Sequence, residues 1–297
     1  MRPLNSLTKT IFLTAAMIYL TGCGWTPETS WWSPVFSDDD QGVAMFEQNR
    51  EVQRNIILHG SGSATRYTDF QVHIGPVGEA LAPVGPPLEG QAQALYYMGS
   101  AGYVVLARTV KVDDEHNAWI VNRIDTATGV SREVTRTTAP TTIDCDPNDG
   151  SAFGGPNGVK AVPSPDGALI AVMVNTADCQ GTQSTLRFLD GQTLEQVAPQ
   201  QTAFRPYDPQ RGPGHAELSW LPDGRVVASN DALFFNPNSV MAYTPGGEPE
   251  VLEGVPQDCF YPATTSSDTR ADGQRVVERR DGEYALEPGG TVYGCDL

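Results

Sequence analysis

Short β-branched runs separated by turns set the pattern of apolar and polar positions along this chain. The segment 161–174, AVPSPDGALIAVMV, shows it most clearly: an apolar entry leads into the turn at 164–167, and a β-branched run follows over 169–174. Proline presets φ for a tight turn, aspartate bonds to its own backbone, and glycine accepts a positive φ. The segment therefore predicts two antiparallel strands joined by a turn.

Four further segments repeat this pattern, at 31–46, 96–107, 218–229 and 264–278. The turn positions that carry the repeat are Asp39, Asp166, Gly167, Asp223, Gly224, Asp272 and Gly273. In the second unit the turn has decayed to Ser100-Ala101-Gly102, so the aspartate position falls at 39, 101, 166, 223 and 272. Successive aspartate positions are 62, 65, 57 and 49 residues apart. Units at such intervals are typical of propeller blades with uneven loops.

A second, outer hairpin is expected after each unit. Two candidates are full pairs of strands, 67–74 with 79–84 and 119–124 with 130–135. Two others are a strand followed by a turn, 186–189 before Asp190-Gly191 and 241–243 before 245–247. The pattern thus predicts an all-β fold, a β-propeller of about five four-stranded blades over residues 31–297.

The Ser-Pro-Asp-Gly turn before a β-branched strand resembles the TolB-like and WD-type propeller repeats of bacterial envelope proteins. The turns at 164–167, 221–224 and 271–273 carry this resemblance. It implies a propeller fold and an envelope location, and it transfers no catalytic residue. TolB itself has six blades and an additional N-terminal domain, whereas five units are counted here and no room is left for that domain.

The N-terminus has the layout of an export signal. Arg2 and Lys9 precede an apolar run of ten residues at 11–20, which is shorter than the roughly 20 residues of a membrane-spanning helix. The run ends in Leu20-Thr21-Gly22-Cys23, which resembles the bacterial lipobox. The resemblance implies a signal peptide over 1–22, diacylglycerol on the Cys23 sulfur and acylation of the new amine. A chance cysteine after an ordinary signal peptide is the alternative.

The residues after the lipid site bear on location. Residues 23–30 are expected to form a lipidated tether before the propeller domain. Gly24 follows the cysteine, and the absence of aspartate there favours the outer membrane of a Gram-negative bacterium by analogy with enteric lipoproteins. The membrane is therefore an expected partner, reached through the lipid.

Charge excludes one class of partner. The chain carries a net charge of −17, with 30 Gly and 23 Pro. Such a surface repels phosphate backbones, so we expect no nucleic-acid binding, and it also repels anionic lipid unless an anchor holds it there.

The remaining cysteines are even in number. Cys145, Cys179, Cys259 and Cys295 predict two disulfides in an exported chain. Three pairings are possible, and Cys145–Cys179 with Cys259–Cys295 is favoured because each pair flanks one inner hairpin. A zinc site is the alternative, but no CxxC or nearby histidine accompanies them.

Candidate chemistry is sparse. Asp144, Asp146 and Asn148 partly resemble a calcium loop, but the glycine and the bidentate glutamate of that loop are missing, so no cofactor is expected beyond this calcium candidate. The acidic run 38–40 is interpreted as a repeat turn rather than a cation site. The four histidines at 59, 73, 116 and 215 are scattered, and no GxSxG motif accompanies them, so no catalytic residue is assigned.

These features predict a lipid-anchored binding or scaffold module of the cell envelope, without catalysis and with an envelope protein as partner. The alternative is an envelope hydrolase or lyase that acts on a glycan or peptide at the channel mouth. A cluster of acids and histidine at one mouth would favour the enzyme.

Overall fold

The protein is all-β in the part of the chain that the structure describes. The computed structural model describes residues 25–57, 60–140, 142–144, 152–154, 158–178, 181–206, 216–230, 239–255, 259, 270, 273–279 and 282–288. Within those ranges no α-helix is found, and no helix has the length and apolar character needed to cross a bilayer.

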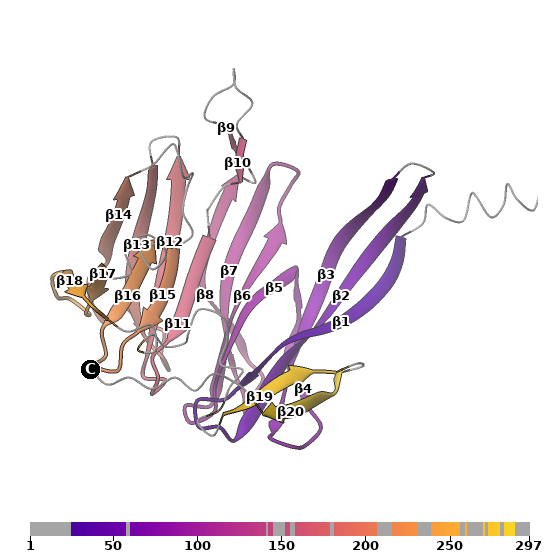
Figure 1. Cartoon of the computed structure of the whole chain (residues 1–297), viewed down its shortest axis with the longest axis horizontal. Coiled ribbons are helices and arrows are strands. Elements are labelled where there is room, and N and C mark those ends of the chain that lie inside the picture. Colours follow the sequence, from indigo (N-terminus) through magenta and orange to yellow (C-terminus); the bar gives the residue numbers. More distant parts are fainter. Residues whose placement is uncertain are drawn as a thin grey trace, which may run out of the picture.

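Four antiparallel sheets of four strands follow one another in chain order (Figure 1). The first sheet contains β1 (Trp25–Phe36), β2 (Gly42–Ile57), β3 (Gly60–Pro76) and β4 (Ala82–Glu89). The second contains β5 (Gln91–Met98), β6 (Tyr103–Lys111), β7 (His116–Asp125) and β8 (Ser131–Pro140). The third contains β11 (Gly158–Pro163), β12 (Leu169–Asp178), β13 (Gly181–Asp190) and β14 (Gln201–Pro206). The fourth contains β15 (Ala216–Trp220), β16 (Val226–Asn230), β17 (Ser239–Tyr243) and β18 (Glu250–Glu253).

Two short hairpins complete the described structure. One pairs β9 (Thr142–Asp144) with β10 (Ala152–Gly154), between the second and third sheets in the sequence. The other, the C-terminal hairpin, pairs β19 (Gln274–Glu278) with β20 (Tyr284–Pro288). The hairpin β9–β10 was not predicted, because its strands are too short to show a period.

The repeat turns lie where the sequence alignment places them. In each four-stranded sheet the turn joins the first two strands, and in the fifth unit it comes directly before β19. The residue after the aspartate position has a positive φ in all five units: Asp40 (59°), Gly102 (74°), Gly167 (67°), Gly224 (84°) and Gly273 (80°). The five units therefore share one backbone conformation at this position. Asp272 lies outside the described residues.

Side-chain bonds explain why the first and third turns match. The Ser164 hydroxyl donates to an Asp166 carboxylate oxygen at 2.6 Å and accepts the Leu169 N–H at 2.9 Å. In the same way the Ser37 hydroxyl donates to Asp39 at 2.5 Å and accepts a backbone N–H five residues on. The acidic run 38–40 is thus built into a turn, as predicted.

The first strand begins earlier than the sequence indicated. Residues 25–30, expected in a tether, form the start of β1 and pair with 48–53 of β2. The physical reason is the length of β2, which continues to Ile57 and offers an unpaired edge whose backbone groups need partners. The boundary expected at residue 31 therefore falls inside a strand.

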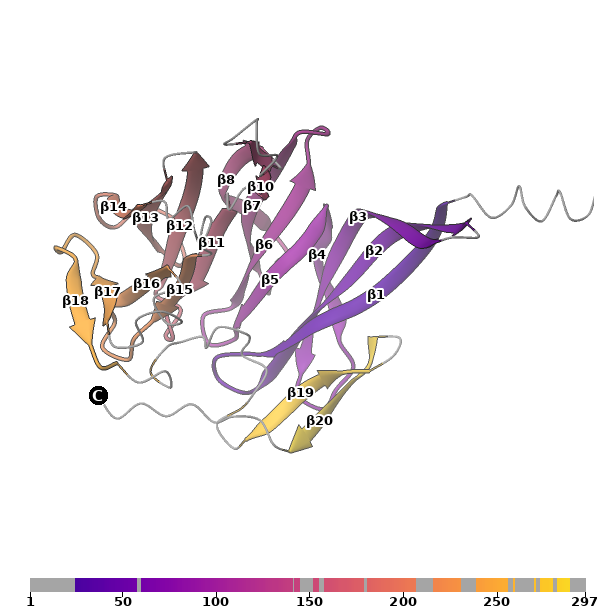
Figure 2. The same ribbon diagram turned by 45° about the horizontal axis from the view of Figure 1, so that its top comes forward.

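Apolar side chains fill the spaces between successive sheets. A cluster that includes Phe46 and Leu106 joins the first sheet to the second. One that includes Val105 and Ile170 joins the second to the third, and one that includes Phe188 and Trp220 joins the third to the fourth. The C-terminal hairpin packs back on the first sheet through Phe36, Val43 and Val276. Figure 2 shows the resulting arc of sheets, with the hairpin beside β1.

Candidate functional site

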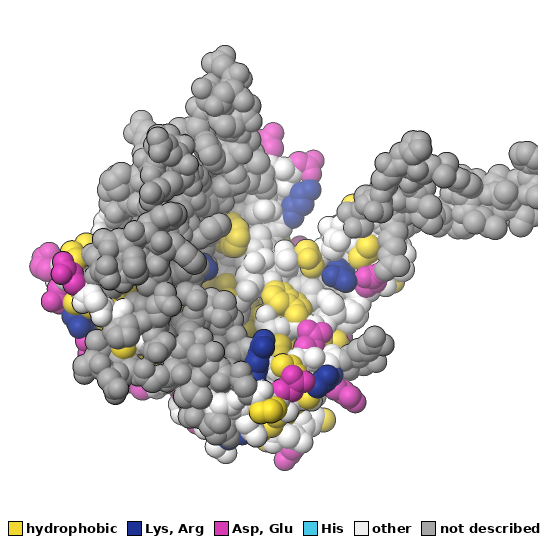
Figure 3. All heavy atoms as spheres, in the orientation of Figure 1, with side chains coloured by type: hydrophobic (Ala, Val, Ile, Leu, Met, Phe, Trp, Pro, Cys, Tyr) yellow, Lys and Arg dark blue, Asp and Glu magenta, His cyan; other side chains and the backbone are white. Residues whose placement is uncertain are grey.

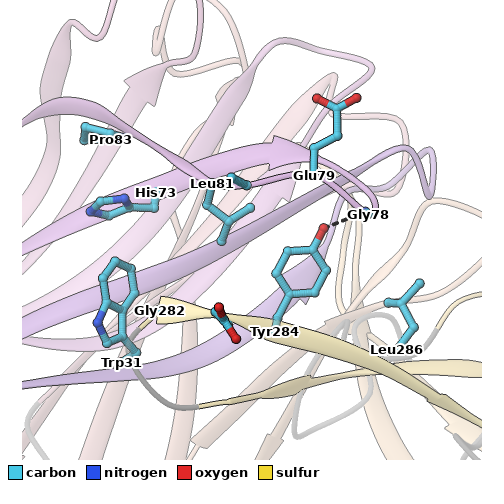
Figure 4. Close-up of a pocket in the computed structure, with 11 residues that line it drawn as sticks. Trp31, His73, Gly78, Glu79, Leu81, Pro83, Gly282, Tyr284 and Leu286 are labelled. Carbon is cyan, nitrogen blue, oxygen red and sulfur yellow. Dashed lines mark hydrogen bonds between the residues drawn. The ribbon is translucent and has the colours of Figure 1, made fainter.

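A pocket of about 610 Å³ lies between the first sheet and the C-terminal hairpin. Its walls include Trp31, His73, Leu81, Pro83, Tyr284 and Leu286 (Figure 4). These side chains come from β1, β3, the β3–β4 connection, β4 and β20. The pocket thus forms where the two ends of the described chain meet.

A histidine–carboxylate pair supports one wall. His73 is 8% exposed, and its Nε2 lies 2.8 Å from Glu47 Oε2 on the neighbouring strand β2. The Trp31 ring meets the His73 ring in an edge-on arrangement, with centroids 4.7 Å apart and planes at 67°. Trp31 is the register partner of Glu47, so the three side chains come from three adjacent strands. This wall is held in place by both a hydrogen bond and ring packing.

The opposite wall depends on the Tyr284 hydroxyl. It accepts the Gly78 N–H at 2.6 Å (Figure 4) and also donates to the Pro76 carbonyl at 3.2 Å. Pro76 ends β3, and Gly78 lies in the turn between β3 and β4. A residue 206 positions away in sequence thus ties the hairpin to the first sheet.

Gly282 allows the hairpin to approach Trp31 closely. Its φ is +84°, and a Cβ placed there would lie 2.7 Å from the indole ring. A side chain at this position would be strained by its backbone conformation and would displace Trp31 or the hairpin. The glycine therefore sets the spacing between Trp31 and the hairpin.

The charge at the pocket is negative. Glu79 and Glu283 line it and are exposed, and the residues that line it include no Lys or Arg. Figure 4 shows the Glu79 carboxylate pointing away from Tyr284 and Leu286. A neutral or cationic ligand fits this setting better than an anion.

Asp166 and Asp223, which also have shifted pKa values, belong to repeat turns. Bonds from the Ser164 hydroxyl and the Ala168 N–H lower the pKa of Asp166, and a hydrogen bond from the Arg225 side chain lowers that of Asp223. Neither aspartate lines the pocket. The repeat-turn positions are therefore structural in the described chain.

The remaining predicted residues are dispersed. His116 faces Asp113, with its Nδ1 3.0 Å from the carboxylate, whereas His59 and His215 lie outside the described residues. Asp144 ends β9, and the other two calcium candidates, Asp146 and Asn148, are not described. Within the described ranges no three His, Cys, Asp or Glu side chains gather as a metal site would require.

The cysteine predictions are only partly in view. Cys259 is 2% exposed and packs with Leu221, Val227 and Ala242. Cys23, Cys145, Cys179 and Cys295 lie outside the described residues, so lipidation and both pairings stay predictions.

Sequence reasoning missed the pocket. It placed Trp31 at the start of a repeat unit and His73 among scattered histidines, and it did not single out Tyr284. A usable signal was the pair Trp31-Trp32: neighbouring strand residues point to opposite faces, so the two rings cannot both enter one core. Trp32 packs on Phe46, 5.4 Å between centroids, while Trp31 faces the pocket.

The sequence matches no protein-family model and no curated protein.

Proposed function

We propose that this protein is a lipid-anchored binding module of the cell envelope, built as a propeller of five units. The five equivalent turns, the four four-stranded sheets in an arc and the hairpin packed back on the first sheet support the propeller. In this arrangement β19 and β20 are the middle strands of the fifth blade. The Cys23 lipid is inferred from the lipobox resemblance and holds the module at the outer membrane.

The observation that carries a binding function is the pocket between the first sheet and the hairpin. Aromatic and aliphatic side chains line it together with His73, Glu79 and Glu283, so it offers a ligand both apolar surface and polar groups. The Trp31 and Tyr284 rings give apolar surface, while Glu79 and Glu283 disfavour anions. The ligand is therefore a neutral or cationic segment with an apolar face, such as part of an envelope protein.

Two disulfides belong to the same proposal. The burial of Cys259 beside Leu221 and Ala242 suits a cystine that fixes the chain after the fourth sheet. A disulfide between Cys259 and Cys295 would stabilise the folded chain by about 3–4 kcal/mol in the chain-entropy model. Peptide mapping without reduction reads out this pairing directly.

One observation favours the enzymatic alternative. The pair His73–Glu47 lies at the pocket, as a general base and its orienting carboxylate would. In a hydrolase or lyase acting on a glycan or peptide, His73 would be the general base and Glu47 would orient it. Loss of turnover in His73→Gln, with ligand binding retained, would identify catalysis, whereas equal binding and no turnover in either protein supports the binding module.

Site-specific photo-crosslinking in cells tests the binding function. A photoreactive phenylalanine analogue replaces Glu79, which is exposed beside the pocket. The matched control replaces Val130, which is 50% exposed in the connection between β7 and β8. We expect a crosslinked adduct from position 79 and none from position 130. The adduct from position 79 should be lost in the Cys23→Ala background, because the lipid anchor brings the protein close to its partner. Identical adducts at both positions, or none at 79, would overturn a pocket-based function.

A further inference from the structure

The first sheet extends an arm beyond the other strands. This arm, residues 25–28 of β1, 50–57 of β2 and 60–67 of β3, lies beyond the paired length of β4, whose pairing with β3 ends at Asp69. Figures 1 and 2 show these strand ends extending away from the remaining sheets. Most of its described side chains are exposed or half-buried, so the arm has no packed partner within the described chain.

An aromatic–arginine pair marks the outer part of the arm. Trp25 is 42% exposed, and the Arg66 guanidinium lies 5.3 Å from its ring centroid. Arg66 is also ion-paired with Glu51. Figure 3 shows hydrophobic, basic and acidic side chains side by side at this end of the sheet. Tryptophan is enriched at the headgroup level of membranes, and arginine binds phosphate well.

The arm differs in charge from the rest of the chain. Residues 25–28 and 50–67 contain three Arg and two Glu, a net charge of +1, in a chain of net charge −17. The described pairs Arg50–Glu28 and Arg66–Glu51 lie here. Anionic headgroups are thus repelled by the chain as a whole but not by the arm.

Chain length places the proposed lipid at this end. Cys23 comes two residues before Trp25, so its Cα lies at most about 7 Å from that of Trp25. Trp25 is paired with Gln53, and β2 continues four residues further to Ile57, about 13 Å along the strand. Along the strand direction, the hairpin end of the arm therefore lies further out than Cys23 can reach.

We propose that the outer end of the arm rests on the lipid bilayer, with Trp25 and Arg66 in the headgroup layer. The proposal rests on the lipidation of Cys23. The apolar residues Ile56 and Ile57 occupy the register positions at the hairpin end. Trp31 follows Trp25 by six residues, so the pocket is held about 20 Å further along β1 from this membrane contact.

Fluorine NMR of the full chain tests the contact. The protein is purified from membranes after labelling with 5-fluorotryptophan and is placed in nanodiscs of phosphatidylethanolamine and phosphatidylglycerol that contain a headgroup spin label. A Trp25→Phe variant assigns the Trp25 resonance, and Trp119 and Trp220 serve as internal controls in the second and fourth sheets. We expect Trp25 to lose more than half of its intensity and both controls to keep theirs.

The mass of the same sample separates the two proposals. If the mass includes the lipid and the Trp25 resonance keeps its intensity, the membrane contact is overturned while the anchor stands. If the mass lacks the lipid, the anchor itself is overturned, and the contact that rests on it falls as well.

Discussion

The seam between the second and third sheets and the seam between the first sheet and the C-terminal hairpin are closed in different ways. At the former, Tyr103 is fully buried, donates to the Gly167 carbonyl at 2.8 Å and lies under the Arg123 guanidinium, 4.6 Å from the ring centroid. Gln192 adds a bond to the Ala101 carbonyl at 2.9 Å. The repeat turns themselves are thus bonded from sheet to sheet, around a broad apolar cluster.

The hairpin seam has less of each component. Among the described residues, its buried apolar side chains are Phe36, Val43 and Val276, and the Tyr284 hydroxyl supplies hydrogen bonds across it. A two-stranded hairpin is marginally stable alone, so β19–β20 depends on this seam. The pocket therefore forms where sheet packing is thin, because a tightly filled seam leaves no space for a ligand.

Truncating the centre of the filled seam is expected to have the largest effect. Tyr103→Ala removes a fully buried ring and should lower the free energy of unfolding by about 3–5 kcal/mol. Tyr103→Phe removes the bond to Gly167 alone and should cost about 1 kcal/mol. Urea denaturation measures both. Equal losses in the two variants would show that packing of the ring contributes little to this seam.

Two glycines in equivalent turns separate backbone strain from contact between sheets. Gly167 has a φ of +67°, and a Cβ there would lie 2.6 Å from the Ala101 side chain of the second sheet; Gly224 has a φ of +84° and open space. Gly167→Ala should therefore cost about 2–4 kcal/mol and Gly224→Ala about 1–2 kcal/mol. Thermal unfolding at matched pH compares them, and a larger loss at Gly224 would contradict a close contact at Gly167.

The repeat turns made the all-β class and the four-stranded antiparallel sheets predictable, because turn chemistry is local. The turn at 164–167 contains within four residues the serine, aspartate and glycine that bond to one another in the structure. The strand boundaries were less predictable. Residues 25–30 have weak strand character of their own and are strands because β2 pairs with them.

The pocket could not be predicted in the same way. Trp31, His73 and Tyr284 lie far apart in sequence and are brought together by sheet pairing and by the return of the hairpin to the first sheet. No local spacing encodes such a meeting. The histidine alone gave no signal, because its partner Glu47 becomes adjacent only through the register of β2 and β3.

Acid should weaken the third repeat turn. Hydrogen bonds lower the pKa of Asp166 in the folded state, so its contribution is complete above the unfolded value of about 3.9 and is lost as the pH falls through the folded value. Asp166→Asn should cost about 1 kcal/mol at neutral pH and little in strong acid. Urea unfolding across pH 2–7 measures the difference between the two proteins. A constant difference over this range would contradict the linkage, and Ser164→Ala should reduce the pH dependence partially, since it removes one of the bonds.

The smallest expected change is at the hairpin seam. Tyr284→Phe keeps the ring and removes the bonds to the Gly78 N–H and the Pro76 carbonyl, so global stability should fall by less than about 1 kcal/mol. Because these bonds tie the hairpin to the first sheet, amide exchange in residues 274–278 and 284–288 should quicken by about 2–5-fold. Tyr103→Phe is the matched control, since it removes a phenol bond from the filled seam and should leave exchange in the hairpin unchanged. Unchanged exchange in Tyr284→Phe would mean that apolar contacts such as those of Val276 hold the hairpin without the hydroxyl. The two seams would then differ in the extent of their apolar packing and not in their use of hydrogen bonds.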